Sequence, residues 1–139
     1  MESVKALSAR SLQYYAIGRQ WQSDLEFFKV ETAFLHRLLD DYFIPLSNEI
    51  YLNRLKKAGE NLFRLEEDES RMEILLNSQL RELELMAEDM IAEDAEQLSG
   101  TQVELEYMIA GLAKAYREVK QELFSLIECL IKDRKMLTA

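Results

Sequence analysis

Carboxylates are the only chemically active side chains that this sequence gathers in number, and they are concentrated in one stretch. The 139 residues carry 26 Asp and Glu against 17 Lys and Arg, for a formal net charge of -9. Nine of these acids lie between Glu82 and Glu106, a segment without Lys or Arg, so the segment accounts for the whole net charge. Such a cluster predicts either a docking surface for a basic partner, a loose site for divalent cations, or simply a solvated helical hairpin.

The hairpin that we expect around Gly100 places most of these carboxylates at one tip of the fold. Lys5, Arg10 and Arg19 near the N-terminus are expected at the same tip, where they offset the acidic charge. The candidate interaction residues at this tip are Glu88, Asp89, Glu93, Asp94, Glu96, Glu104 and Glu106.

The sequence lacks the common motifs for catalysis, metal binding and nucleotide binding. His36 is the single histidine and Ala33 precedes it by three positions, so the Glu-x-x-His pair of carboxylate-bridged di-iron bundles does not occur. Cys129 is the single cysteine, and a lone thiol beside apolar residues usually fills space in a core. The four glycines are too scattered for a nucleotide-binding loop. The sequence therefore predicts a protein without enzymatic activity, resident metal or cofactor.

The acidic balance also bears on partners and location. A pI of about 4.7 disfavours nucleic acid, because affinity for phosphate backbones comes largely from clustered Lys and Arg. Charges interrupt every apolar stretch before it reaches the roughly 20 residues that span a bilayer. One cysteine and the absence of a signal-peptide pattern indicate the cytoplasm.

The elements that must position these side chains are helices. Only four Gly and one Pro interrupt the chain, and apolar residues recur with alternating three- and four-residue spacing. Pro45 and Gly100 mark two short connections, which favour antiparallel neighbours. We expect a single all-α domain over residues 1–139, an antiparallel up-down-up three-helix bundle of long coiled-coil-like helices. The predicted helices cover about 4–17, 20–44, 48–98 and 101–137, the first helix being broken or kinked near Gly18.

The apolar residues at this spacing form one stripe, or seam, along each helix. Two polar residues fall on the apolar seam of the second helix. Glu69 is a candidate buried polar residue, and the alternatives are an exposed overhang or a bend, or a metal or proton site formed with neighbouring carboxylates inside the bundle. Gln79 is interpreted as a buried polar residue that fixes helix register.

A second apolar row beside the seams makes each helix more apolar than a single bundle requires. It consists of Phe27, Phe34 and Leu38 in the first helix, Ile50, Leu52, Phe63, Leu75 and Leu80 in the second, and Val103, Met108, Phe124, Ile127 and Ile131 in the third. Because large exposed apolar patches usually mark interfaces, we expect a homodimer. The leading functional hypothesis is a non-enzymatic interaction or scaffold protein that presents helix faces or the acidic tip to a protein partner. The alternative is a carboxylate-ligated metalloprotein or helical-bundle enzyme with Glu ligands from facing helices.

Overall fold

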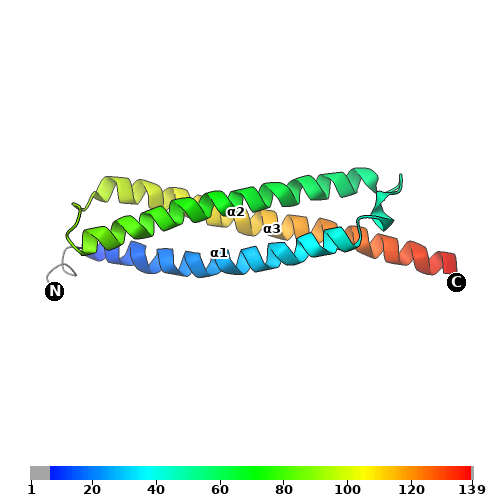
Figure 1. Cartoon of the computed structure of the whole chain (residues 1–139), viewed down its shortest axis with the longest axis horizontal. Helices are drawn as coiled ribbons and strands as arrows, with labels where there is room; N and C mark the ends of the chain where they lie inside the picture. The colour runs from blue at the N-terminus through cyan, green and yellow to red at the C-terminus, as the bar shows by residue number, and fades with distance from the viewer. Residues whose placement is uncertain (1–6, 139) are drawn as a thin grey trace.

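Three long helices form one bundle in the computed structural model, which describes the backbone of residues 7–138 and the side chains of residues 7–134. Helix α1 covers Ala9–Asp41, a short 3-10 turn η2 covers Pro45–Ser47, α2 covers Leu52–Ala87 and α3 covers Ala95–Thr138. Each helix packs against the other two in an up-down-up order (Figure 1). The predicted fold class is confirmed. The predicted start of the first helix at residue 4 lies outside the described residues.

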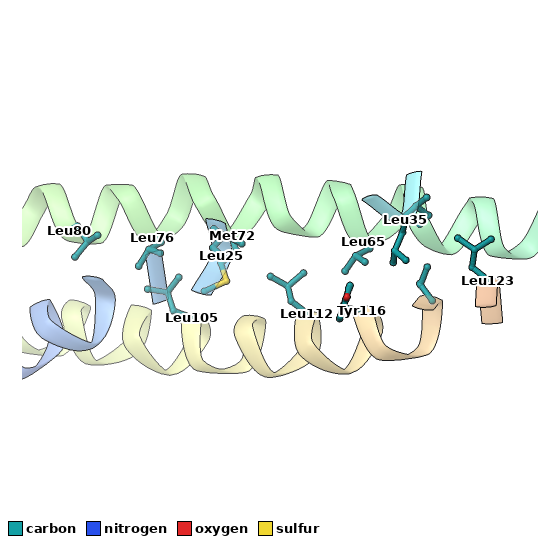
Figure 2. Packing of buried hydrophobic residues seen from close by; sticks show 12 residues of the cluster. Leu25, Leu35, Leu65, Met72, Leu76, Leu80, Leu105, Leu112, Tyr116 and Leu123 are labelled. Atoms are coloured by element: carbon teal, nitrogen blue, oxygen red, sulfur yellow. The ribbon is translucent and has the colours of Figure 1, made fainter. Parts of the chain in front are cut away.

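The core follows from the spacing of leucines along each helix. Leu25 and Leu35 of α1, Leu76 of α2, and Leu105 and Leu112 of α3 are each almost completely buried. Figure 2 shows such side chains from all three helices meeting along the bundle axis. Since burying one leucine contributes on the order of 2 kcal/mol, this row supplies most of the driving force that holds the helices together.

The predicted break near Gly18 is not confirmed, because α1 is one helix of 33 residues that continues through this position. Gly18 is instead buried where α1 approaches α2. A Cβ atom built on Gly18 would lie 2.8 Å from Leu80 Cδ2. The glycine therefore serves close packing of two helices, a role that sequence spacing alone does not distinguish from that of a helix breaker.

The connection between α2 and α3 lies before the predicted position. The second helix ends at Ala87 rather than at residue 98, and Gly100 lies exposed inside α3. Asp89 takes the left-handed conformation with φ 59°, and the Met90 N–H donates to the Leu85 carbonyl at 2.8 Å. This pattern is a Schellman C-cap, in which Asp89 occupies the site that glycine usually fills.

The next helix begins with an N-cap that the sequence reading overlooked. Asp94 accepts a hydrogen bond from the Gln97 N–H through its Oδ1 at 3.1 Å. Asp at the cap and Gln three residues later is a variant of the capping box, and it opens α3 before the start at residue 101 that the sequence predicted. The predicted hairpin about Gly100 is therefore wrong, and the turn consists of residues 88–94.

The other connection agrees better with its sequence signals. Pro45 opens η2, and Asn48 Oδ1 accepts hydrogen bonds from the N–H groups of Ile50 and Tyr51 at 3.0 and 3.2 Å. Leu46 is fully buried against this end of the core, and the Tyr51 hydroxyl donates to the Asp133 carboxylate. The helix after this turn begins at Leu52, four residues later than predicted.

Candidate interaction surfaces

The acidic tip contains five of the seven predicted residues. Glu88 and Asp89 follow the end of α2, Glu93 and Asp94 lie in the turn, and Glu96 lies in the first turn of α3. Asp94 and Glu96 therefore sit at a helix N-terminus, where the dipole favours carboxylates, whereas the sequence analysis placed them at a C-terminus.

Glu104 and Glu106 are not part of this tip. They lie nine and eleven residues after Ala95, which is about 14 and 17 Å along the helix axis. Their predicted place at the start of a helix is wrong because α3 begins before Gly100. Both belong to the shaft of the bundle.

Glu93 shows how the tip holds its negative charge. Its carboxylate accepts hydrogen bonds from the hydroxyls of Ser11 and Ser8 at 2.5 and 2.6 Å, and from the Ser8 N–H at 3.1 Å. These bonds, the Ser11 bond first, lower the pKa of the Glu93 carboxyl. The start of α1 thus lies at the acidic tip as predicted, but hydroxyl and N–H groups stabilise Glu93. Of the bases expected to do so, Lys5 lies outside the described residues.

Glu69 is buried in the middle of the bundle, only 4 % exposed, and α2 runs through it without interruption. Of the readings that the sequence leaves open for Glu69, the structure agrees with a buried polar residue and not with an overhang or a bend. The Thr32 hydroxyl of α1 donates to Glu69 Oε2 at 2.5 Å. Desolvation raises the pKa of the Glu69 carboxyl to about 7, with the Thr32 hydrogen bond opposing this rise. Glu66 raises the same pKa further and Lys29 lowers it.

The polar layer around Gln79 joins α2 to α3. The Gln79 side-chain amide donates to the Leu98 carbonyl at 3.1 Å and to Gln102 Oε1 at 3.4 Å. Both glutamines are buried, and Gln102 Nε2 has no hydrogen-bond partner among the described residues. Because these bonds form only when the two helices align in one way, the arrangement is compatible with the predicted role of Gln79 in fixing register.

A row of aromatic rings follows the face where α1 and α3 run side by side, which we call the α1–α3 groove. Phe27 packs edge-on against Phe28, with ring centroids 6.2 Å apart, and Phe28 lies 5.8 Å from Tyr116 of α3. The Lys120 ammonium lies 5.7 Å from both the Tyr116 and Phe124 ring centroids. The rings thus form one connected surface across the two helices.

Much of this surface is exposed to solvent. Phe27 is 58 %, Phe34 43 %, Val103 52 % and Phe124 39 % exposed. Half the surface of four such side chains is on the order of 300 Å², spread along the groove with Glu106, Arg117 and Lys120 between Val103 and Phe124. Only part of the second apolar row predicted from sequence lies here, since Phe63 is exposed on α2 outside the groove and Leu80 is buried.

One end of the α1–α3 groove is hollowed. The depression has a volume of about 530 Å³, and Ile17 and Trp21 of α1 face Gln102 and Val103 of α3 across it. Trp21 and the α3 residues around the hollow are far apart in the sequence, which gave no sign that they meet. The signal that was available is the shared position of Trp21 and Ile17 on successive turns of one helix.

The remaining chemical groups are dispersed. Among the side chains that the structure describes, no three His, Cys, Asp or Glu residues are grouped so as to hold a metal ion. In the described part of the chain, no helix is long and apolar enough to cross a membrane. Cys129 is partly buried beside the Leu46 cluster.

Comparison with known proteins adds no functional clue, since neither a family model, nor a curated protein, nor a solved structure matches this chain.

Proposed function

We propose that this chain is a non-enzymatic interaction or scaffold protein, a helical bundle that self-associates and offers helix faces to a protein partner. The observation that carries this proposal is the exposed aromatic surface of the α1–α3 groove. Water contact with these rings is unfavourable by about 25 cal/mol per Å² of apolar area, and a second protein surface removes it. Tyr116 and Phe28 belong to or pack against the buried core, whereas the most exposed rings, Phe27, Phe34 and Phe124, are not part of that core cluster.

The acidic tip is a second surface in this proposal, suited to a basic protein partner. Glu93 is already engaged by two serine hydroxyls, and Asp94 caps α3. Glu88, Asp89 and Glu96 are the exposed carboxylates that remain for a partner.

The proposal is tested by measuring the mass of the wild-type chain by light scattering across a dilution series up to about 50 μM. We expect a dimer that dissociates on dilution. Replacing two groove residues together, Phe27→Lys and Phe34→Lys, should lower the association constant at least tenfold, because two ammonium groups would have to be desolvated in the contact.

Phe63→Lys provides the matched control for this variant. Phe63 is 62 % exposed, as much as Phe27, but it belongs to α2, outside the groove. The control should associate like the wild type. A wild-type chain that stays monomeric at 50 μM contradicts the proposal, as does a control that dissociates as readily as the groove variant.

A further inference from the structure

The outward row of α3 residues along the α1–α3 groove has a symmetric pattern. It reads Val103, Glu106, Ala110, Ala113, Arg117, Lys120 and Phe124, at alternating three- and four-residue spacing. Around Ala113 the row is apolar at each end, acidic on one side and basic on the other. A row with this pattern complements a copy of itself running in the opposite direction.

We propose that the occupant of the α1–α3 groove is a second copy of this chain, packed antiparallel, with the two α3 helices crossing at Ala113. This inference rests on the proposed function, to which it adds the partner, the face and the orientation. A two-fold axis at Ala113 makes the contact self-complementary, as closed dimers require.

Charge complementarity is the first argument for this arrangement. Glu106 and Lys120 each lie seven residues from Ala113, about 10 Å along the helix on opposite sides. The two-fold axis therefore brings Glu106 of each copy to the level of Lys120 in the other. Arg117, exposed one turn before Lys120, adds to the basic side.

The hollow in the groove provides the second argument. Phe124 and Val103 lie eleven and ten residues from Ala113, again on opposite sides. The same axis therefore places Phe124 of the second copy over the hollow beside Trp21 and Val103. An aromatic side chain that fills a pocket on its partner is the usual anchor of a stable interface.

The acidic tip argues for the antiparallel rather than the parallel orientation. In a parallel pair, the segments between Glu82 and Glu106 of both copies would lie side by side, with no Lys or Arg between them. The repulsion acts within a Debye length, about 8 Å at physiological salt. The antiparallel pair separates the two tips by the length of the bundle.

The area of this face is sufficient for a dimer. Between Val103 and Phe124, α3 rises by roughly 30 Å, and two adjacent helices are about 20 Å wide. A contact of these dimensions buries about 600 Å² per copy and so reaches the lower part of the range of specific interfaces. Weak and transient contacts lie at this end of the size range, so we expect a dimer that dissociates on dilution.

Charge reversal tests the pairing of Glu106 with Lys120. Glu106→Lys and Lys120→Glu should each weaken the homodimer at least tenfold, because each reversal creates two like-charged pairs across the axis. An equimolar mixture of the two single variants should form a heterodimer of wild-type affinity, since every charged pair is then opposite in sign. Native mass spectrometry distinguishes the heterodimer from the homodimers.

Matched controls come from the opposite flank of α3. Glu104 faces α2, in a depression that it shares with Ile74 and Met108. Glu104→Lys makes the same charge change two residues away and should leave dimer affinity unchanged. Circular dichroism of each variant establishes that the helices are intact, and the mixing experiment is itself a rescue of both variants.

A disulfide reports the position of the axis. In a Cys129→Ser background, Ala113→Cys should form an intermolecular disulfide on mild oxidation, because the two Cα atoms of residue 113 are brought together by the axis. Ser70→Cys, on the exposed side of α2, should not cross-link.

Failure of this inference and failure of the proposed function give different results. A wild-type chain that is monomeric overturns both. A wild-type dimer that tolerates Glu106→Lys, gives no heterodimer on mixing and does not cross-link at residue 113 overturns the antiparallel pairing alone, and leaves self-association through another register or face.

Discussion

The two sides of α1 are built differently. Toward α2, polar side chains close the flank: the Lys29 ammonium donates to Glu73 at 3.0 Å, and a His36 ring nitrogen lies 3.1 Å from Glu66. Toward α3, the Tyr116 hydroxyl donates to Glu31 at 2.6 Å, but exposed Phe27 and Phe34 occupy the outer flank.

The contrast indicates which side of α1 has partners for its side chains within one chain. Polar groups on the α2 side find partners inside the same molecule and have little to gain from another protein. Rings on the α3 side are left in contact with water, so a further surface lowers their free energy.

The largest expected effect comes from the buried carboxyl on the α2 side, through Glu69→Gln. The folded-state pKa of Glu69, about 7, lies above its ordinary value of 4.5. The folded chain therefore holds a proton that the unfolded chain releases, and the free energy of unfolding falls as pH rises from 4.5 to about 7. The loss is at most about 3 kcal/mol and persists above this range.

Glutamine keeps the shape of the side chain but does not ionise. We expect Glu69→Gln to be more stable than the wild type at pH 8, with little difference at pH 4.5. Urea unfolding at matched protein concentration across this pH range measures both. Glu67→Gln, exposed on the same helix, is the control, and its free energy of unfolding should depend on pH as that of the wild type does. If the free energy of unfolding of Glu69→Gln falls with pH as much as that of the wild type, another titrating group causes the fall.

The next effect concerns the close approach of α1 to α2 at Gly18. Gly18→Leu should lower the free energy of unfolding by about 1–3 kcal/mol, because Leu80 and Leu76 already fill the space beyond its Cα atom. Gly100→Ala gives the opposite result in α3, where no atom lies within 4 Å of the added Cβ, and should stabilise the chain by up to ~1 kcal/mol. Thermal unfolding compares the two. Stabilisation by Gly18→Leu would contradict close packing at this position.

The sequence predicted the helices, their antiparallel order and the apolar seams, because apolar periodicity is a property of each helix by itself. It failed at Gly18 and Gly100, since glycine can serve close packing, a turn or an exposed helical site, and only the neighbouring helix decides among them. At Glu69 the sequence left burial, an exposed overhang and a bend all open. A carboxyl is tolerated there because Thr32 comes from another helix to meet it, and such a pairing depends on register between helices.

For each candidate surface, too, the sequence predicted some features and missed others. The acidic residues were predicted directly from composition, but the hairpin that arranges them was misplaced, because α2 ends at Ala87 rather than at residue 98 and α3 begins at Ala95 rather than at 101. Glu104 and Glu106 were therefore assigned to the tip. The apolar row of the α1–α3 groove was visible in the spacing. Its hollow was not, because Trp21 and Val103 are 82 positions apart in the sequence and meet only in the folded bundle.

The smallest effect tests the polar flank by itself. A double-mutant cycle with Lys29→Gln and Glu73→Gln should give a coupling of roughly 0.3–1 kcal/mol, since both side chains are more than one-third exposed and solvent screens the pair. The coupling should shrink in 0.5 M NaCl, because salt at that concentration screens charges beyond a few ångströms. On the other flank, Phe34→Gln should change the stability of the monomer by a similar amount without any salt dependence, while lowering the association constant. A coupling above about 2 kcal/mol would contradict solvent screening of the Lys29–Glu73 pair. Association that responds to Lys29→Gln as strongly as to Phe34→Gln would mean that both sides of α1 contribute to the dimer contact, and would contradict the contrast between them.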